Sequence, residues 1–171
     1  MNIISTERLE LFPLTQTQLE LGLSDLSRLE DELSMVIAQD FVTERVQRAI
    51  RMKVEKMRMA EPSKHVWITY WLIVIKEEKV GAGMLGFKGY PITKGSTEIG
   101  YGIDPAYQNK GYMTEAVQAL INWAFSHPFC KEITATEVSN PASRRLLEKL
   151  GATQTEGNEK FTSWKIQKTI T

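Results

Sequence analysis

The strongest sign of chemistry in this sequence is a turn at residues 104–111. It reads Asp-Pro-Ala-Tyr-Gln-Asn-Lys-Gly and joins a segment of alternating apolar residues to a long amphipathic one. This change of period predicts a strand followed by a helix. The first amides of a helix lack carbonyl partners, and the helix dipole makes them attractive to anions. Residues 108–113 are therefore either a pyrophosphate site, with Gly111 allowing close approach, or an ordinary capped helix start.

The segments around this turn are predicted from hydrophobic periodicity and from breaker residues. Helices are predicted to begin at Thr15 and Thr43 and to span residues 111–125 and 140–151. Strands are predicted at residues 8–12, 66–75, 80–87, 97–103, 131–138 and 161–170. This order predicts an α/β (α+β) fold in one domain over residues 1–171, with a mixed, mostly antiparallel central sheet of about six to seven strands flanked by helices.

Composition excludes several classes of protein. The chain has 171 residues, of which 42% are hydrophobic and 25% charged, and a domain of this size needs no disulfide or metal to fold. Its 21 basic and 21 acidic residues cancel, which argues against nucleic acid and membrane partners. One cysteine excludes an internal disulfide, and no apolar run approaches the ~20 residues of a membrane span. We expect a cytoplasmic protein without a metal.

One glycine motif and three reactive side chains are assigned to structure rather than to chemistry. Residues 81–86 match the dinucleotide fingerprint G-x-G-x-x-G, but the residues after them cannot open the helix that such a site requires. We therefore expect these glycines in a strand, close to a bulky neighbour. His65 and His127 belong to no metal-ligand spacing, and Cys130 is expected to be a buried, inert thiol.

Motifs along the whole chain are similar to those of one enzyme family. Gln108-x-x-Gly111-Tyr112-Met113 resembles the Q/R-x-x-G-x-G/A signature of the GNAT superfamily of acyl-CoA-dependent N-acyltransferases. Asn140-Pro-Ala-Ser143, followed by Leu150-Gly-Ala, resembles the second motif of that family. The opening Thr6-Glu-Arg-Leu-Glu-Leu, the strand Thr97-Glu-Ile-Gly-Tyr and Thr114-Glu-Ala resemble the branch that acetylates protein N-termini, typified by the ribosomal-protein alanine acetyltransferases.

The resemblance implies that acetyl-CoA is the cosubstrate and that it binds between two splayed strands, residues 97–103 and 132–138. The residues implied to hold its pyrophosphate are Gln108, Asn109, Lys110, Gly111, Tyr112, Met113 and Thr114. The pantetheine arm would pair with backbone near Gly102 and Ile103, and Asn140 and Ser143 would also contact the cosubstrate.

The chain departs from the family pattern at two positions. Met113 stands where glycine or alanine is common, which matters little because only its backbone is required. Leu147 stands where many relatives have the tyrosine that protonates the leaving thiolate, so this residue cannot be the acid.

Two residues are candidates for moving protons in an acyl transfer to an amine. Glu98 shares a strand face with Gly100 and Gly102 and is the candidate base, since relatives carry a glutamate on this strand. A structural or substrate-positioning carboxylate is the alternative. Ser143 is the candidate acid or thiolate hydrogen-bond donor, and a plain polar residue in the first helical turn is its alternative.

Other residues near these motifs are expected to be structural. Glu115 lies in the first turn of its helix, where the dipole favours a negative charge. Trp67, Tyr70 and Trp71 are either part of an acceptor pocket or, as we prefer, packed in the core.

The sequence therefore predicts an N-acetyltransferase that moves an acetyl group from acetyl-CoA to a primary amine, on a protein N-terminus or a small molecule. A non-catalytic acyl-CoA-binding module or sensor is the alternative that Leu147 keeps open. A third interpretation, RNA binding by the basic residues 43–60, lacks any RNA-binding signature. The acceptor stays unassigned, and the choice between a monomer and a homodimer stays open.

Overall fold

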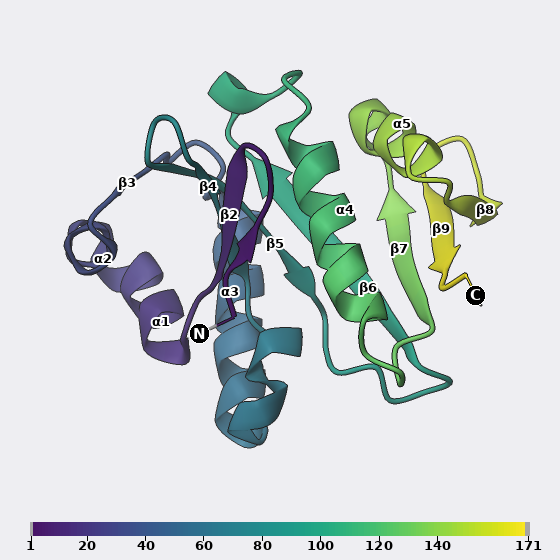
Figure 1. The fold of residues 1–171 in the computed structure, drawn as a ribbon, viewed down its shortest axis with the longest axis horizontal. Coiled ribbons are helices and arrows are strands. Elements are labelled where there is room, and N and C mark those ends of the chain that lie inside the picture. The colour runs from purple at the N-terminus through teal and green to yellow at the C-terminus, as the bar shows by residue number, and fades with distance from the viewer. Residues whose placement is uncertain (1, 170–171) are drawn as a thin grey trace.

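The computed structural model of the protein describes residues 2–169, and one twisted sheet lies at its centre (Figure 1). Among these residues the sheet has nine strands, in the order β1-β2-β4-β5-β6-β7-β9-β8, with β3 beside β5. Neighbouring strands are antiparallel except for two parallel pairs, β6 with β7 and β3 with β5. The strands are β1 (Ile4–Ser5), β2 (Leu9–Pro13), β3 (Val36–Ile37), β4 (Trp71–Ile75), β5 (Val80–Phe87), β6 (Ser96–Ile103), β7 (Glu132–Val138), β8 (Thr153–Gly157) and β9 (Thr162–Gln167).

The predicted mixed, mostly antiparallel sheet is confirmed, with more strands than the sequence suggests. β1 and β3 have two residues each, and every residue of β8 is exposed, so none of the three shows the apolar alternation that periodicity detects. The predicted strand at 161–170 is observed as β9, and its last residue, Ile170, lies outside the described residues.

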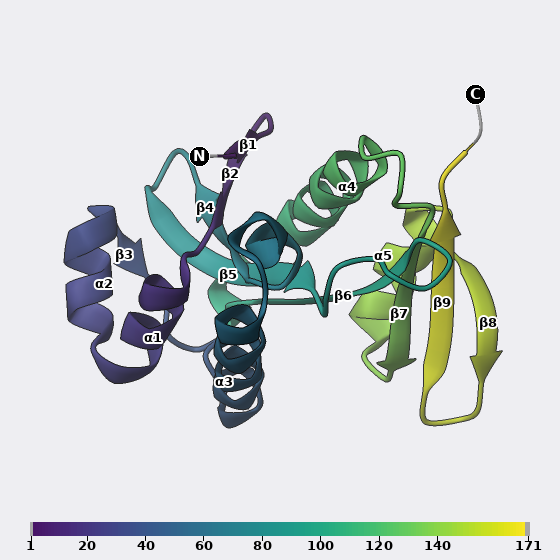
Figure 2. The same cartoon turned by 90° about the horizontal axis from the view of Figure 1, so that it is seen from below.

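Helices cover both faces of the sheet. The helix α4 (Tyr112–Phe125) packs on one face, and α1 (Gln16–Ser24) and α3 (Glu44–Met59) pack on the other (Figure 2). α2 (Leu26–Leu33) lies beside β3, and α5 (Pro141–Lys149) follows β7. The predicted caps are present, because the hydroxyls of Thr15 and Thr43 accept hydrogen bonds from the amides three residues later. Each face of the sheet therefore has its own apolar core.

The strands β4, β5 and β6 form the predicted antiparallel meander. Its middle strand carries the rejected fingerprint glycines, which lie in extended backbone as expected. A Cβ on Gly83 would lie 2.4 Å from the Gly102 carbonyl oxygen, and one on Gly86 would lie 2.4 Å from the Thr69 carbonyl oxygen. These glycines therefore allow neighbouring backbone segments to approach closely, the structural role expected from the sequence.

The strand predicted at residues 66–75 is wrong in its first half. Pro62 opens a short 3-10 helix (Pro62–Trp67), and β4 begins only at Trp71. Trp67 is 2% exposed and packs against Phe87 and Trp123. The aromatic and β-branched composition of this stretch reflects burial, which helices and strands share, so periodicity alone could not separate the two.

No helix within residues 2–169 has the length and apolar character needed to cross a membrane.

Candidate active site

The gap between β6 and β7 is the first component of the site. Residues 96–98 of β6 pair with residues 132–134 of β7, and within residues 2–169 these two strands form no further pairs beyond Glu98. β7 is held on its other side by β9, with an irregularity between Ala135 and Val138, and Glu137 within it has a φ of 52°. The two strands therefore separate toward the carboxyl end of β6, as the sequence predicts.

The direction of the backbone groups on β6 follows from two hydrogen bonds. The Glu98 carbonyl accepts a hydrogen bond from the Lys88 amide at 2.8 Å, so it faces β5. The Thr97 carbonyl accepts one from the Thr134 hydroxyl at 3.4 Å, so it faces β7. Because this direction alternates along a strand, the backbone groups of residues 99, 101 and 103 face the gap.

An extended ligand in the gap would therefore meet backbone at Tyr101 and Ile103. Ile103 is one of the two residues that the sequence analysis expects beside the pantetheine arm. Gly102, which the prediction pairs with the ligand, directs its backbone to Met84 of β5 instead. What Gly102 contributes is open space, because nothing lies within 4 Å of a Cβ placed on it.

The turn after β6 presents unpaired backbone amides. Asn109 and Gly111 both have left-handed backbone, with φ of 59° and 79°, and α4 begins without a side-chain cap. Within the described residues, none of the backbone amides of residues 109–114 donates to a protein group. The Gln108 side-chain amide reaches back to the Ile103 carbonyl at 3.4 Å. This row of donors at a helix N-terminus has the chemistry of a phosphate site.

A positive charge from the other end of the chain lies beside this turn. The Arg8 guanidinium donates from Nη1 to the Lys110 carbonyl at 2.8 Å and pairs through Nε with Glu115 at 2.7 Å. It also lies 4.6 Å from the centre of the Tyr112 ring. A Cβ on Gly111 would come within 3.2 Å of Arg8 Nη2, so Arg8 borders the surface that the glycine leaves open.

Glu115 fixes Arg8 in this place. Its carboxylate accepts hydrogen bonds from the Thr6 hydroxyl at 2.6 Å and from the Arg8 amide at 2.9 Å. Partial burial acts to raise the pKa of Glu115, but the hydrogen bonds from Thr6 and Arg8 outweigh it and hold that pKa below its usual value. Glu115 thus has the structural role that the sequence suggests, tying the N-terminal hairpin to α4.

Glu98 projects from the face of β6 opposite to α4. Its carboxylate accepts a hydrogen bond from the Thr136 hydroxyl at 2.6 Å and pairs with the Lys88 ammonium. Nothing lies within 4 Å of a Cβ placed on Gly100 or Gly102, so this face of the strand stays open beyond Glu98.

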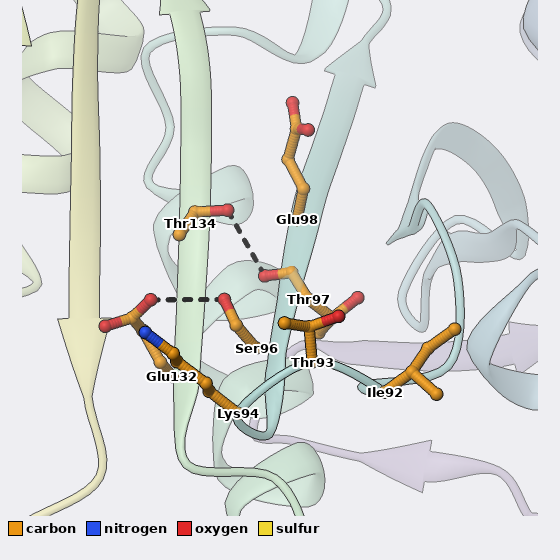
Figure 3. A pocket seen from close by; sticks show the side chains of 8 residues that line it. All are labelled: Ile92, Thr93, Lys94, Ser96, Thr97, Glu98, Glu132 and Thr134. Atoms are coloured by element: carbon orange, nitrogen blue, oxygen red, sulfur yellow. Dashed lines mark hydrogen bonds between the residues drawn. The ribbon is translucent and has the colours of Figure 1, made fainter.

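A cavity of about 520 Å³ adjoins Glu98 on this face (Figure 3). Glu98 extends along β6 away from the loop that closes the opposite end of the cavity. Polar side chains of β6 and β7 form its floor, where Ser96 donates to Glu132 at 3.1 Å. The lining residues are Ile92, Thr93, Lys94, Ser96, Thr97, Glu98, Glu132 and Thr134.

The start of α5 lies across the gap from β6. Asn140 is the predicted N-cap, with its side-chain oxygen accepting from the Ala142 amide at 2.8 Å. Ser143 is half-buried and lies in the first turn of α5. Leu147 is 1% exposed and belongs to the apolar core that includes α4.

The remaining candidates lie in the core. Trp67 and Trp71 are buried in the predicted packing role. Tyr70 is half-buried and lies under the ammonium of Lys53, 4.3 Å from the ring centre. Cys130 is buried, and burial raises the pKa of its thiol to about 11.

Comparisons with known proteins identify the family. A profile of the acetyltransferase (GNAT) domain matches residues 8–153. The chain belongs to the GNAT acetyltransferase family. It is 39% identical to YjdG of Bacillus subtilis, an uncharacterized N-acetyltransferase, over 95 residues that make up 55% of this chain and 56% of YjdG. It is 29% identical to YjcK of the same species, a probable N-acetyltransferase, over 80% of this chain and 75% of YjcK.

Solved structures show the same GNAT fold. RimL, a ribosomal L7/L12 α-N-protein acetyltransferase in complex with coenzyme A, superposes with a TM-score of 0.68 at 18% identity over 97% of this chain and 98% of RimL. A ribosomal-protein-S5-alanine acetyltransferase from Vibrio fischeri gives a TM-score of 0.66 at 18% identity over 98% and 97% of the two chains. In sequence, the chain spans only about half the length of several curated relatives, 56% of YjdG and 46% of YnaD among them.

The residues of this GNAT chain fit the CoA that the family implies. The free amides of residues 109–114 and the Arg8 charge suit a pyrophosphate, and the backbone of residues 101 and 103 suits an extended amide-bearing arm. Sequence reasoning missed Arg8 and Tyr101. Arg8 lies 107 positions from its partner Glu115, so only its place within the Thr6-Glu-Arg motif was visible.

Proposed function

We propose that the protein transfers an acetyl group from acetyl-CoA to a primary amine. The observation that carries this proposal is the row of unpaired amides at residues 109–114, beside Arg8 and at the mouth of a gap between two strands, in a chain of the GNAT family. Acetyl-CoA supplies the acetyl group as an activated thioester. The chain's own residues then have three tasks, which are to hold the pyrophosphate, to accept a proton from the amine and to stabilise the leaving sulfur.

Glu98 is proposed to accept the amine proton. Its carboxylate lies on the open face of β6 next to a cavity, and its hydrogen bond with Thr136 and its ion pair with Lys88 hold it at the edge of the gap. An acceptor ammonium entering this face would compete with Lys88 for the same carboxylate. A general base in this position adds about 10²–10⁴-fold to a rate.

Ser143 is proposed to donate a hydrogen bond or a proton to the leaving sulfur. It lies in the first turn of α5, across the gap from β6, and Leu147 supplies no donor one helical turn later. The backbone of Tyr101 and Ile103 is proposed to align the pantetheine arm as an added strand. Asn140 caps α5 through its side-chain oxygen, and it is proposed to contact the same arm as well.

The acceptor is proposed to be an α-amine of a peptide or a small amine. Two structural neighbours are named for acetylating ribosomal proteins, RimL at the α-amine of L7/L12 and the Vibrio fischeri protein at an alanine of S5. An α-amine, with a pKa of about 7.7–8.0, loses its proton more readily than a lysine, with a pKa of about 10.4. A modest base such as a partly exposed glutamate therefore suits an α-amine acceptor better than a lysine acceptor.

The proposal is tested by measuring the release of free CoA from acetyl-CoA with N-terminal peptides, polyamines, amino acids and aminoglycosides as acceptors. Thermal unfolding with and without CoA is measured in parallel, because a ligand that binds only the folded state raises the melting temperature. CoA binding together with acceptor-dependent release supports the enzyme. CoA binding without release for any acceptor would support the binding module that Leu147 keeps as a second candidate. No CoA binding would refute both.

A further inference from the structure

Three lysines gather on the face of the sheet that carries Glu98. Lys88, which directly follows β5, lies opposite Glu98 and pairs with its carboxylate. Lys56 of α3 donates to the Lys88 carbonyl at 2.9 Å. Lys53, three residues earlier in α3, donates to the Phe87 carbonyl at 2.7 Å. This face is therefore rich in positive charge at the place where the acceptor amine is proposed to bind.

The two contacts of Glu98 leave one of its oxygens open. The Thr136 hydroxyl and the Lys88 ammonium both donate to Oε1. Within residues 2–169 no protein group donates to Oε2, and the Glu98 side chain is 23% exposed. Oε2 is therefore the atom that can receive an acceptor ammonium. This second cation would share the carboxylate with Lys88.

An ammonium bound at Glu98 leaves the positive charges of this face in excess. In the part of the chain that the structure describes, Lys88 has no other carboxylate partner and Lys56 has none at all. Lys53 is buried, and two backbone carbonyls hold its ammonium in place, so it cannot move away. Like charges this close repel one another, and a negative group on the acceptor would relieve the repulsion.

The neighbouring cavity has no comparable excess of charge. Besides Glu98, its lining contributes one lysine and one glutamate, Lys94 and Glu132. These two charges offset each other. A negative group on the acceptor is therefore drawn toward Lys88 and Lys56 rather than into the cavity.

The arrangement of Glu98 and Lys88 sets the distance between amine and acid in the acceptor. Residues directly opposite each other on antiparallel strands have Cβ atoms about 4.5–5.5 Å apart. An extended peptide advances about 3.3–3.6 Å per residue. An acceptor whose amine reaches Glu98 can thus place a carboxylate of its first or second residue at Lys88.

Building on the proposed acetyl transfer, we propose that the acceptor is an amine with a carboxylate within two residues of it, as in an acidic peptide N-terminus. Glu98 takes the amine proton, while Lys88 and Lys56 bind the carboxylate and determine specificity. The carboxylate is recognised and takes no part in the making or breaking of bonds. A free amino acid carries the same two groups, so the experiment includes both sources.

The first test compares acceptors that differ only in charge. Three tetrapeptide amides have alanine first and aspartate, asparagine or lysine second, and alanine and alaninamide are the small acceptors. We expect the kcat/KM of the aspartate peptide, measured by CoA release, to exceed that of the asparagine peptide about five- to tenfold, by less at high salt. The lysine peptide should be poorer than both. The same preference for alanine over alaninamide would assign the site to free amino acids, and a preference confined to the peptides would assign it to acidic N-termini.

The second test removes the lysines one at a time. Lys56→Gln and Lys88→Gln should each lower the ratio of kcat/KM between the aspartate and asparagine peptides to about threefold or less. This ratio is the measure, because the loss of Lys88 also changes the surroundings of the base. The matched control is Arg51→Gln, which should leave the ratio unchanged. Arg51 is exposed and lies two turns before Arg58, whose guanidinium pairs with a carboxylate of α1, so it faces away from the acceptor.

The outcomes separate this inference from the function on which it rests. Equal kcat/KM within both matched pairs, the aspartate and asparagine peptides and alanine and alaninamide, would overturn the inference and leave acetyl transfer standing. A preference that survives in both Lys56→Gln and Lys88→Gln would overturn it as well, because the carboxylate would then bind elsewhere. Binding of CoA without release from any acceptor would overturn acetyl transfer, and this inference with it.

Discussion

Gly111 and Gly151 make a matched pair for testing the phosphate site. Both have left-handed backbone, with φ of 79° and 76°. A Cβ on Gly151 would meet nothing within 4 Å, whereas a Cβ on Gly111 would lie 3.2 Å from Arg8 Nη2. Gly111→Ala and Gly151→Ala therefore introduce the same backbone strain, and only the first displaces a charge from the turn.

Backbone strain should lower the melting temperature of both variants, whereas only Gly111→Ala should also raise the Kd for CoA. An L-residue in left-handed backbone costs about 1–2 kcal/mol, which for a protein of this length lowers the melting temperature by roughly 2–8 °C in both variants. Gly111→Ala should in addition lose one charge-assisted hydrogen bond to phosphate. Such a bond contributes about 1.5–3 kcal/mol, which corresponds to a rise of about 10- to 100-fold in the Kd for CoA.

The assay is isothermal titration of CoA into each variant at one fixed salt concentration, with circular dichroism melts of the same samples. We expect Gly151→Ala to bind CoA with wild-type affinity in spite of its lower melting temperature. If Gly111→Ala bound CoA as tightly as Gly151→Ala, the pyrophosphate would have to lie elsewhere, and the assignment of residues 109–114 would be wrong.

Four further predictions concern Arg8, Glu98 and two buried groups, Lys53 and Cys130. Arg8→Ala should raise the Kd for CoA about tenfold, and by more at low salt than at high salt, whereas the control Arg28→Ala on the exposed side of α2 should leave the Kd unchanged. If titration gave Arg8→Ala and the wild type the same Kd, Arg8 would not belong to the site. Glu98→Gln should keep CoA binding and lower the rate about 10²–10⁴-fold, with a loss that shrinks as pH rises and the amine deprotonates on its own; rates equal to wild type at every pH would exclude it as the base. Burial, with the charges of Lys56 and Lys88, lowers the pKa of Lys53 to about 7, below its value in the unfolded chain, so the free energy of unfolding should rise by at most about 1.4 kcal/mol per pH unit between pH 7 and 10. Urea titrations of Lys53→Met should lack this rise. Identical pH slopes in the wild type and the variant would mean that the carbonyls of Ile68 and Phe87 keep the ammonium charged. Cys130 should react slowly with a thiol reagent at pH 8 in the native protein and rapidly in guanidinium, because burial raises its pKa to about 11; fast native labelling would contradict the buried thiol.

The sequence by itself determined those parts of the protein whose signals are local. Hydrophobic periodicity places α4, β5 and β6 within about one residue of their observed ends. It succeeds because α4 and β6 each bury one face in a core and β5 buries nearly all of its residues. Caps and stops at Thr15, Thr43, Asn140 and Gly151 were readable for the same reason, since each acts on amides or carbonyls within a few residues. The turn that presents free amides is likewise a local structure.

Tertiary structure decided what depends on residues far apart in the chain. Arg8 borders the phosphate turn because a carboxylate 107 positions later holds it there. Glu98 is oriented by Thr136, 38 positions away. The backbone of Tyr101 and Ile103 is left unpaired on the β7 side because β6 and β7 part after three residue pairs. Period and propensity record how a side chain is buried, and they carry no information on which distant group it meets. The local scaffold of the site was therefore predictable, and the partners that tune its charges and protons were not.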